Sequence, residues 1–256
     1  YQPRGGTAVF GLDNDVTRGW WEACAAAGRV QALGFSLHEA PPAGAYLHDD
    51  TLLLRHVTGD EEAICRSNEV RLRGGHNVAN LLAACCLSRA AGASVAAMRQ
   101  VATTFAGVAH RLELVRQFGG VSWYNDSIAT TPERALAAIH SFDETIVLLA
   151  GGRDKHLPWG PLAAAVRDHV RCVVTFGEAA DLIERELADW ASSHPGAPGR
   201  APAVHGGSDL AGAVSLAATL ARPGDVVLLS PGGTSYDAYQ DFAARGEHYR
   251  ALVKAL

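Results

Sequence analysis

One pattern in the second half of the chain limits the fold more than any other feature. Short, largely apolar segments at 145–150, 172–176 and 225–229 are expected to be buried strands, and a glycine-containing turn follows each of them. Helical segments come next, for example at 179–190. Strands and helices that alternate in this way are typical of a doubly wound, mostly parallel α/β sheet, so we predict that fold here.

The first half of the chain has a different organisation, which indicates a second domain. We expect strands at 7–11, at 30–35 and on both sides of the turn-forming pair Asp49-Asp50, and helices at 15–27, 77–91 and 95–105. A domain boundary is expected at Gly107. Beyond it, segments 111–116 and 121–125 flank Gly119-Gly120, which is a signal for a β-hairpin.

The composition excludes several classes of protein. Hydrophobic residues make up 48% and charged residues 19% of the chain, as in a globular protein, and the net charge of -5 gives no electrostatic footprint for nucleic acid. No apolar run approaches the roughly 20 residues of a membrane span, and the first residues do not resemble a signal peptide. We therefore expect a cytoplasmic protein without a membrane or nucleic-acid partner.

Cysteine and histidine spacing gives no sign of a metal site or of disulfide bonds. The five cysteines include no CxxC pair, and most lie in apolar or helical surroundings, which is typical of reduced core thiols. The eleven histidines show no HxxxH or HxH spacing. We therefore predict no metal ion held by protein side chains alone.

Polar residues follow three of the expected strands. They form the segments 124–132, 151–155 and 230–236. Because ligands bind beyond the carboxyl ends of strands in open α/β sheets, we expect the three segments to meet at one rim. A carboxylate, several hydroxyls and Lys155, one of only two lysines in the chain, would suit a small amino acid with two carboxylates.

Each of these segments also has a simpler interpretation. Residues 126–131 could cap the helix that begins at Pro132, and Lys155 could be a solvated loop residue. Residues 230–235 could form only a turn. Their joint occurrence at strand ends favours a binding site over three unrelated loops.

A second group of candidate ligand-binding residues lies near the middle of the chain. Asn77 and Asn80 are three positions apart at an expected helix start, so they share one face. Each amide offers a donor and an acceptor, the pattern that an adenine edge needs, although these residues could simply begin the helix. Arg111, at the expected boundary, could bind phosphate through two parallel hydrogen bonds or form a salt bridge.

In their order and spacing these motifs resemble the Mur ligase family over nearly the whole chain. The matching segments are 75–77 with Asn80, 110–113, 125–127 with Thr130, 151–155, and 229–231 followed by Ser235, Asp237, Phe242, Arg245 and Gly246. The resemblance implies that residues 1–107 are the C-terminal part of the family's central ATP-binding domain. Residues 108–256 would be its Rossmann-like C-terminal domain, which binds amino acid and nucleotide. No P-loop pattern occurs in the chain, so the P-loop and the magnesium ligands would lie before Tyr1.

The resemblance is strongest to the branch of the family that adds glutamate to UDP-N-acetylmuramoyl-L-alanine in peptidoglycan precursor synthesis. ATP and Mg²⁺ would activate the alanyl carboxylate as an acyl phosphate, which the glutamate amine attacks. The implied nucleotide contacts are Asn77 and Asn80 on adenine, Asp126 on ribose and Arg111 on phosphate. Glutamate would be bound by Thr130, Lys155, Ser235, Tyr236 and Phe242. Catalysis would rest on Lys155, Arg111 and Asp126.

Ile128 departs from the family pattern, because the usual glutamate-adding branch has a lysine at this position. A related branch with a non-lysine residue adds L-glutamate, so the resemblance leaves the enantiomer open, and we expect D-glutamate as the commoner substrate. The alternatives are a sister Mur ligase, a folylpolyglutamate synthase, or a nucleotide- or amino-acid-binding module without turnover. We expect a monomer, and no ligase activity from the isolated 256 residues.

Overall fold

The computed structural model describes residues 3–256, and the chain folds into two compact units. Unit 1 is Tyr1–Ala106 and unit 2 is Gly107–Leu256. The sequence placed the expected boundary at Gly107. No helix in the described part of the chain is both long and apolar enough to cross a membrane.

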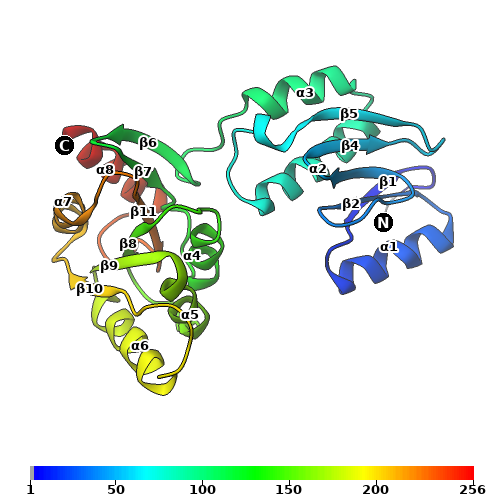
Figure 1. Ribbon diagram of the computed structural model, residues 1–256. Coiled ribbons are helices and arrows are strands. Elements are labelled where there is room, and N and C mark those ends of the chain that lie inside the picture. Colours follow the sequence, from blue (N-terminus) through cyan, green and yellow to red (C-terminus); the bar gives the residue numbers. More distant parts are fainter. Residues whose placement is uncertain (1–2) are drawn as a thin grey trace. The chain divides into compact units, whose positions relative to one another are not determined.

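Unit 1 is a five-stranded mixed sheet with helices packed against it (Figure 1). Its strands lie in chain order: β1 (Thr7–Gly11), β2 (Gln31–Ser36), β3 (Gly44–His48), β4 (Thr51–Arg55) and β5 (Glu61–Arg66). The first three strands run parallel, and β4 and β5 continue the sheet antiparallel. The helical elements are α1 (Asp15–Ala27), α2 (Gly75–Ala90), α3 (Val95–Thr104) and the 3₁₀ turn η1 (Ser67–Glu69).

Local sequence explains where α1 begins and ends. The Asn14 side chain accepts hydrogen bonds from the backbone N–H groups of Val16 and Thr17, which caps the N-terminus. Gly28 follows the last helical residue in the left-handed region, at φ 59°. The helix predicted at 15–27 is therefore confirmed.

The strand β5 was not predicted from the sequence. It begins with two exposed glutamates, and only Ile64 and Cys65 are buried, so it lacks the alternation of a half-buried strand. It lies at the edge of the unit 1 sheet, where one side has no strand partner. Pairing with β4 therefore makes this segment a strand, with little help from its own pattern.

Unit 2 is a six-stranded sheet in the order β10-β9-β8-β11-β7-β6. Its strands are β6 (Glu113–Phe118), β7 (Val121–Asn125), β8 (Ile146–Gly151), β9 (Val170–Phe176), β10 (Ala203–Gly206) and β11 (Val226–Gly232). Its helices are α4 (Pro132–Ile139), α5 (Gly160–His169), α6 (Ala180–Ser193), α7 (Leu210–Leu220) and α8 (Phe242–Ala255). All neighbouring strands run parallel except the β6–β7 hairpin, which confirms the predicted mostly parallel α/β sheet.

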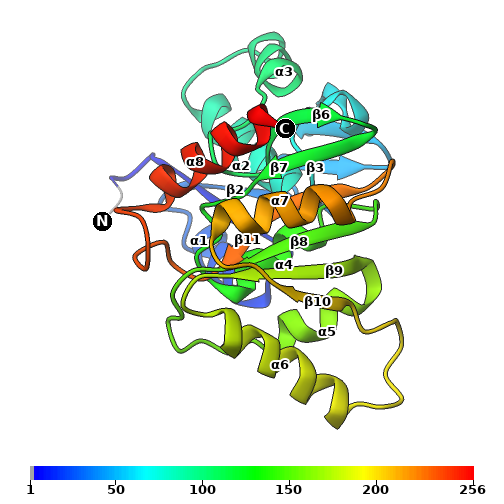
Figure 2. The same cartoon turned by 90° about the vertical axis from the view of Figure 1, so that its left-hand side faces the viewer.

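Helices cover both faces of the unit 2 sheet, which makes the fold doubly wound (Figures 1 and 2). Ile146 and Leu148 of β8 pack in one core with α4, α5 and α6. Val147 and Leu149 of the same strand pack in the other core with α7 and α8. All four side chains are fully buried, as expected for a strand between two helical layers.

The two edges of this sheet differ in how well the sequence predicts them. The hairpin at one edge turns at Gly119 and Gly120, which both have positive φ, 59° and 78°, as the glycine pair predicted. The short strand β10 at the other edge has no fully buried residue, and the sequence did not reveal it. All five cysteines are free thiols, and four of them are buried, whereas Cys24 is half-buried.

Candidate functional site

Three neighbouring strands of unit 2 end at one rim. β8, β11 and β7 are adjacent and parallel, so their carboxyl ends lie at the same edge of the sheet. The segments that follow these strands begin at Gly152, Gly233 and Asp126. The structure therefore brings the three polar segments together.

Hydrogen bonds join these segments across the rim. The Lys155 ammonium donates to Thr130 Oγ1 at 3.3 Å, and Ser230 Oγ donates to Asp126 Oδ2 at 2.9 Å. The backbone N–H of Arg153 donates to the Thr234 carbonyl at 2.9 Å, and the Thr234 N–H returns a bond of 2.8 Å. Two residues predicted to bind glutamate, Thr130 and Lys155, are thus in direct contact.

Close backbone packing at the rim requires glycine before Arg153. A Cβ on Gly152, whose φ is 91°, would lie 2.1 Å from the Thr234 carbonyl oxygen. A Cβ on Gly151 would lie 2.0 Å from the Phe176 carbonyl oxygen. The glycine pair therefore lets this segment lie directly against its neighbours, which fixes the backbone that leads to Lys155.

Asp126 is nearly buried, with 4% of its surface exposed. Its Oδ1 accepts a hydrogen bond from the Leu112 backbone N–H at 3.2 Å, and its Oδ2 accepts the bond from Ser230. Burial raises the pKa of Asp126 to about 7, although the hydrogen bonds and the Arg111 charge oppose this shift. The N-cap residue of α4 is Thr131, which lies within the segment expected to cap the helix, and Asp126 itself is not the cap.

The Asp126→Asn variant should depend on pH differently from the wild-type protein. The pKa of Asp126 rises on folding from 3.8 to about 7, so the native protein holds a proton that the unfolded chain releases in this range. Wild type therefore loses stability as pH rises from about 4 to about 7, by on the order of 4 kcal/mol for such a shift. Asparagine cannot ionise, and its oxygen can accept from the Leu112 N–H while its NH₂ donates to the Ser230 hydroxyl, so the variant should escape this loss.

Urea unfolding of wild type and Asp126→Asn at acidic and slightly alkaline pH measures this difference. We expect the variant to gain stability relative to wild type as the pH rises. Asp143→Asn, which removes an exposed carboxyl from the same unit, is the matched control and should follow wild type. An identical pH dependence in wild type and Asp126→Asn would contradict the raised pKa.

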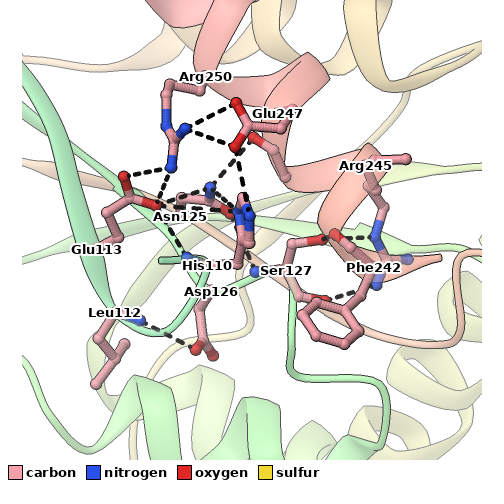
Figure 3. A network of polar contacts seen from close by, with 12 residues as sticks. His110, Leu112, Glu113, Asn125, Asp126, Ser127, Phe242, Arg245, Glu247 and Arg250 are labelled. Carbon is pink, nitrogen blue, oxygen red and sulfur yellow. Dashed lines mark hydrogen bonds and ion pairs between the residues drawn. The ribbon is translucent and has the colours of Figure 1, made fainter. Parts of the chain in front are cut away.

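A buried arginine ties two of the rim segments to α8. Arg245 is 0% exposed and donates to both the hydroxyl and the carbonyl of Ser127, at 3.0 and 2.9 Å (Figure 3). It also donates to the carbonyls of Thr234 and Gly233, at 3.0 and 3.1 Å. Burial lowers the pKa of Arg245 to about 10, so the guanidinium stays charged at neutral pH.

A second network fixes the segment that precedes β6 (Figure 3). Asn125 Nδ2 lies 3.0 Å from His110 Nδ1 and also donates to the Gly246 carbonyl at 3.2 Å, so His110 Nδ1 is the acceptor. The other imidazole nitrogen of His110 lies 3.5 Å from Glu247 Oε1. A Cβ on Gly246 would lie 2.2 Å from His110 Nδ1, so this position in α8 requires glycine.

These networks present Arg111 at the surface of unit 2. The His110 carbonyl accepts from the Ile128 N–H at 3.1 Å, and the Leu112 N–H is held by Asp126. His110 and Leu112 both have positive φ, 65° and 44°, which is rare for these residue types. The Arg111 side chain between them is exposed, which suits a contact with an anionic ligand.

The other residues predicted to bind glutamate have different surroundings. Ser235 is buried, whereas Tyr236 is 63% exposed. Phe242 begins α8, and its ring makes an edge contact with His110, with the centroids 6.3 Å apart. Within residues 3–256, no hydrogen bond or ring contact joins Tyr236 or Phe242 to Lys155.

The residues predicted to contact adenine lie in unit 1, at the start of α2. Asn77 is buried and its Nδ2 donates to the Arg73 carbonyl at 2.7 Å, whereas Asn80 is exposed. The Asn77 amide therefore supports the helix start, as the simpler interpretation allowed, and adenine binding stays a prediction. No cluster of three or more His, Cys, Asp or Glu side chains in residues 3–256 could hold a metal ion.

Sequence reasoning gave no role to Asn125, Arg245 and Gly246, which hold the rim in place. All three lie in the motifs that match the family, and Gly246 gives a further signal of its own. Gly246 lies inside a helical segment, where glycine costs about 1 kcal/mol relative to alanine. A glycine retained at such a position indicates that another group, here the His110 ring, occupies the space of its side chain.

A known protein family matches most of unit 2. Residues 110–233 match the family model described as Mur ligase, glutamate ligase domain. The chain is 42% identical over 251 residues to the UDP-N-acetylmuramoylalanine–D-glutamate ligase of Symbiobacterium thermophilum, covering 97% of this chain and 52% of that protein. The enzyme of the same name from Acetivibrio thermocellus is 36% identical, with 100% and 53% covered. The chain spans about half the length of these curated relatives.

Solved structures show the same fold at lower identity. A folylpolyglutamate synthase of Mycobacterium tuberculosis matches with a TM-score of 0.63 and 14% identity, over 96% of this chain and 55% of its own. A UDP-N-acetylmuramoylalanyl-D-glutamyl-2,6-diaminopimelate–D-alanyl-D-alanyl ligase of Acinetobacter baumannii matches with a TM-score of 0.62 and 15% identity, over 97% and 51%. At these identities the likeness concerns the fold alone.

Proposed function

We propose, from the premise that this chain belongs to the Mur ligase family, that it forms part of an ATP-dependent enzyme joining D-glutamate to UDP-N-acetylmuramoyl-L-alanine. The observation that carries the proposal is the contact between Lys155 and Thr130, which places an ammonium beside a hydroxyl at the carboxyl rim of unit 2. The names of the curated relatives support D-glutamate as the amino acid. The activity is proposed for the full-length enzyme that contains this chain.

In this proposal unit 1 is the last part of the central ATP-binding domain, and unit 2 is the C-terminal domain. Among the proposed nucleotide contacts, Arg111 has the best structural support. Its guanidinium is exposed, its neighbours are held in place, and it could reach a phosphate. The ribose role of Asp126 fits less well, since both carboxyl oxygens already accept hydrogen bonds within the chain. ATP with Mg²⁺, when bound, supplies the phosphoryl group that activates the alanyl carboxylate as an acyl phosphate.

Glutamate brings two carboxylates, and the rim offers two kinds of group to hold them. Lys155 supplies a charge, and the N-terminus of α4, which begins two residues after Thr130, supplies the positive end of a helix dipole. Ile128 adds a half-buried apolar side chain on the same segment. Glutamate held by these groups would present its amine in a fixed orientation to the activated carboxylate, which lowers the barrier to attack.

Replacing Ile128 with lysine should change how the enzyme distinguishes the two glutamate enantiomers, or its affinity for glutamate. Enantiomers carry the same charges, so the shape of the pocket has to separate them, and Ile128 is a branched apolar residue two positions before Thr130. We expect wild type to prefer D-glutamate by roughly tenfold or more, which requires at least about 1.4 kcal/mol of differential stabilisation. The measurement is product formation by the full-length enzyme with each enantiomer offered separately.

Ile128→Val is the matched control, because it keeps a branched apolar side chain and should keep the preference for D-glutamate. Equal use of both enantiomers by wild type would remove Ile128 from the explanation of specificity. So would unchanged kinetics in the Ile128→Lys variant.

Mass spectrometry of the nucleotide product tests the proposed function itself. The full-length enzyme with ATP, Mg²⁺, UDP-N-acetylmuramoyl-L-alanine and D-glutamate should form a nucleotide heavier by one glutamyl residue. The 256-residue chain alone should form none, because its sequence holds no P-loop to orient the phosphates. No product from the full-length enzyme, or product only with a different amino acid or acceptor, would overturn the proposal.

A further inference from the structure

We propose that Asp154 and Trp159 form a clip that positions Lys155, so that Asp154 is a positioning residue for the binding of the amino acid. Residues 155–158, between the two, are all exposed at the rim. Asp154 Oδ1 accepts a hydrogen bond from the Trp159 indole Nε1 at 3.1 Å, which closes the base of this short loop. The inference rests on the function proposed above for Lys155.

Trp159 is the fixed end of the clip. Its side chain is 3% exposed and packs in the core that α4, α5 and α6 share with the sheet. The ring lies so close to Gly232, at the end of β11, that a Cβ there would be 2.8 Å from two ring carbons. Trp159 is also the N-cap residue of α5, and its carbonyl accepts from the Ala163 N–H at 2.9 Å. A bond to this indole therefore ties Asp154 to the rigid part of unit 2.

The second oxygen of Asp154 shapes the backbone immediately after Lys155. Asp154 Oδ2 accepts from the His156 N–H at 2.9 Å, a turn in which an aspartate binds the backbone two residues on. His156 has φ 58°, in the left-handed region that non-glycine residues seldom adopt. The side chain of Asp154 thus binds the backbone of His156 on one side and the Trp159 indole on the other, which holds Lys155 within one fixed turn.

The chain preceding the clip is also fixed. Arg153 is paired with Thr234 through backbone hydrogen bonds, and Gly152 packs against the same residue. Lys155 is therefore the first exposed residue after a rigid anchor, and its ammonium reaches Thr130 Oγ1 at 3.3 Å. Without the Asp154 carboxylate, the loop would keep its backbone anchor at Arg153 and lose the bonds that set the direction of Lys155.

The small number of lysines allows a direct test that needs no substrate. Lys155 and Lys254 are the only lysines in the chain, so acylation by an amine-specific reagent can be followed separately at each of them by peptide mass spectrometry. The probe is the rate at Lys155 divided by the rate at Lys254 in the native 256-residue protein. In Asp154→Ala and in Trp159→Phe this ratio should rise by about two- to ten-fold, because losing a hydrogen bond that fixes the loop weakens the contact between Lys155 and Thr130.

Two further variants separate positioning from a general loss of stability. Asp154→Asn keeps one acceptor oxygen and should give an intermediate ratio. Asp143→Ala removes an exposed carboxylate from the same unit and should leave the ratio unchanged. Lys254 is exposed in the folded protein, so its labelling rate does not report unfolding, and far-UV circular dichroism of each variant is the check that it is folded. The same labelling ratio in wild type, Asp154→Ala and Trp159→Phe would overturn the clip, whatever the substrate of the enzyme is.

Kinetics of the full-length enzyme then test what the clip does for binding. In Asp154→Ala the KM for D-glutamate should rise by about two- to ten-fold, with the KM values for ATP and the nucleotide substrate unchanged. Partial recovery in Asp154→Asn is expected. A raised labelling ratio with an unchanged KM for glutamate would show that the clip exists but does not position the amino acid. Failure of wild type to form product would instead count against the proposed function.

Discussion

Replacing Lys155 with alanine in the full-length enzyme should raise the glutamate concentration needed for half-maximal rate by roughly ten- to a hundred-fold. The reason is that losing a charge-assisted contact to a desolvated carboxylate costs about 1.5–3 kcal/mol. The KM values for ATP and the nucleotide substrate should change little, because Lys155 lies in the segment assigned to glutamate and contacts Thr130. Steady-state kinetics with each substrate varied in turn measures the effect.

The choice of replacement and the second lysine sharpen this experiment. Lys155→Arg should recover little of the loss, because a planar guanidinium cannot take the place of a compact ammonium against Thr130. Lys254→Ala, in the last turn of α8, is the matched control and should behave as wild type. Unchanged glutamate kinetics in Lys155→Ala would contradict the glutamate role and support the alternative that Lys155 is a solvated loop residue.

Replacing Arg245 with alanine should destabilise unit 2 by roughly 3–5 kcal/mol, the range for a large buried side chain whose removal leaves a cavity and unpaired acceptors. The guanidinium is fully buried, and the carbonyls of Ser127 and Gly233 each lose a hydrogen bond. Urea unfolding of the 256-residue protein, followed by a probe in unit 2, measures the loss.

An exposed arginine provides the comparison for this variant. Arg185→Ala removes the same side chain from the surface of α6, where it makes a single bond to the Asp181 carbonyl, and should cost less than about 1 kcal/mol. If Arg245→Ala lowered the free energy of unfolding by as little as Arg185→Ala, Arg245 would not be the link between α8 and the two rim segments.

The rim could be predicted from the sequence because strand direction and hydrophobic pattern determine it. Residues 146–150 and 226–229 are all apolar, so their strands were recognisable, and the parallel order brings their carboxyl ends to one edge. The polar residues that follow those strand ends, including Lys155, could therefore be expected to lie close together at that edge. That inference required only the order and direction of the strands, and no contact between distant side chains.

The supporting networks could not be predicted, because they join residues far apart in the sequence through buried polar groups. Arg245 reaches Ser127 across 118 positions, and Asn125 reaches the Gly246 carbonyl across 121. Neither pairing follows from a local pattern. The near burial of Asp126 belongs to the same class, because the sequence shows only an aspartate after a strand, a position that is usually solvated.

The edge strands were not predicted from the sequence for a different physical reason. β5 and β10 lie at sheet edges, where few side chains are buried and the apolar alternation that reveals a strand is weak. Their conformation comes from pairing with β4 and β9. Neither strand contributes a residue to the rim, so the functional prediction did not depend on them.

A structure of the full-length enzyme with its glutamylated nucleotide product bound tests the central claim most directly. The claim predicts that one carboxylate of the glutamyl group lies within hydrogen-bond distance of Lys155 Nζ and Thr130 Oγ1, with Ile128 against its carbon chain. A glutamyl group bound elsewhere, with Lys155 and Thr130 in contact only with each other and with solvent, would contradict it.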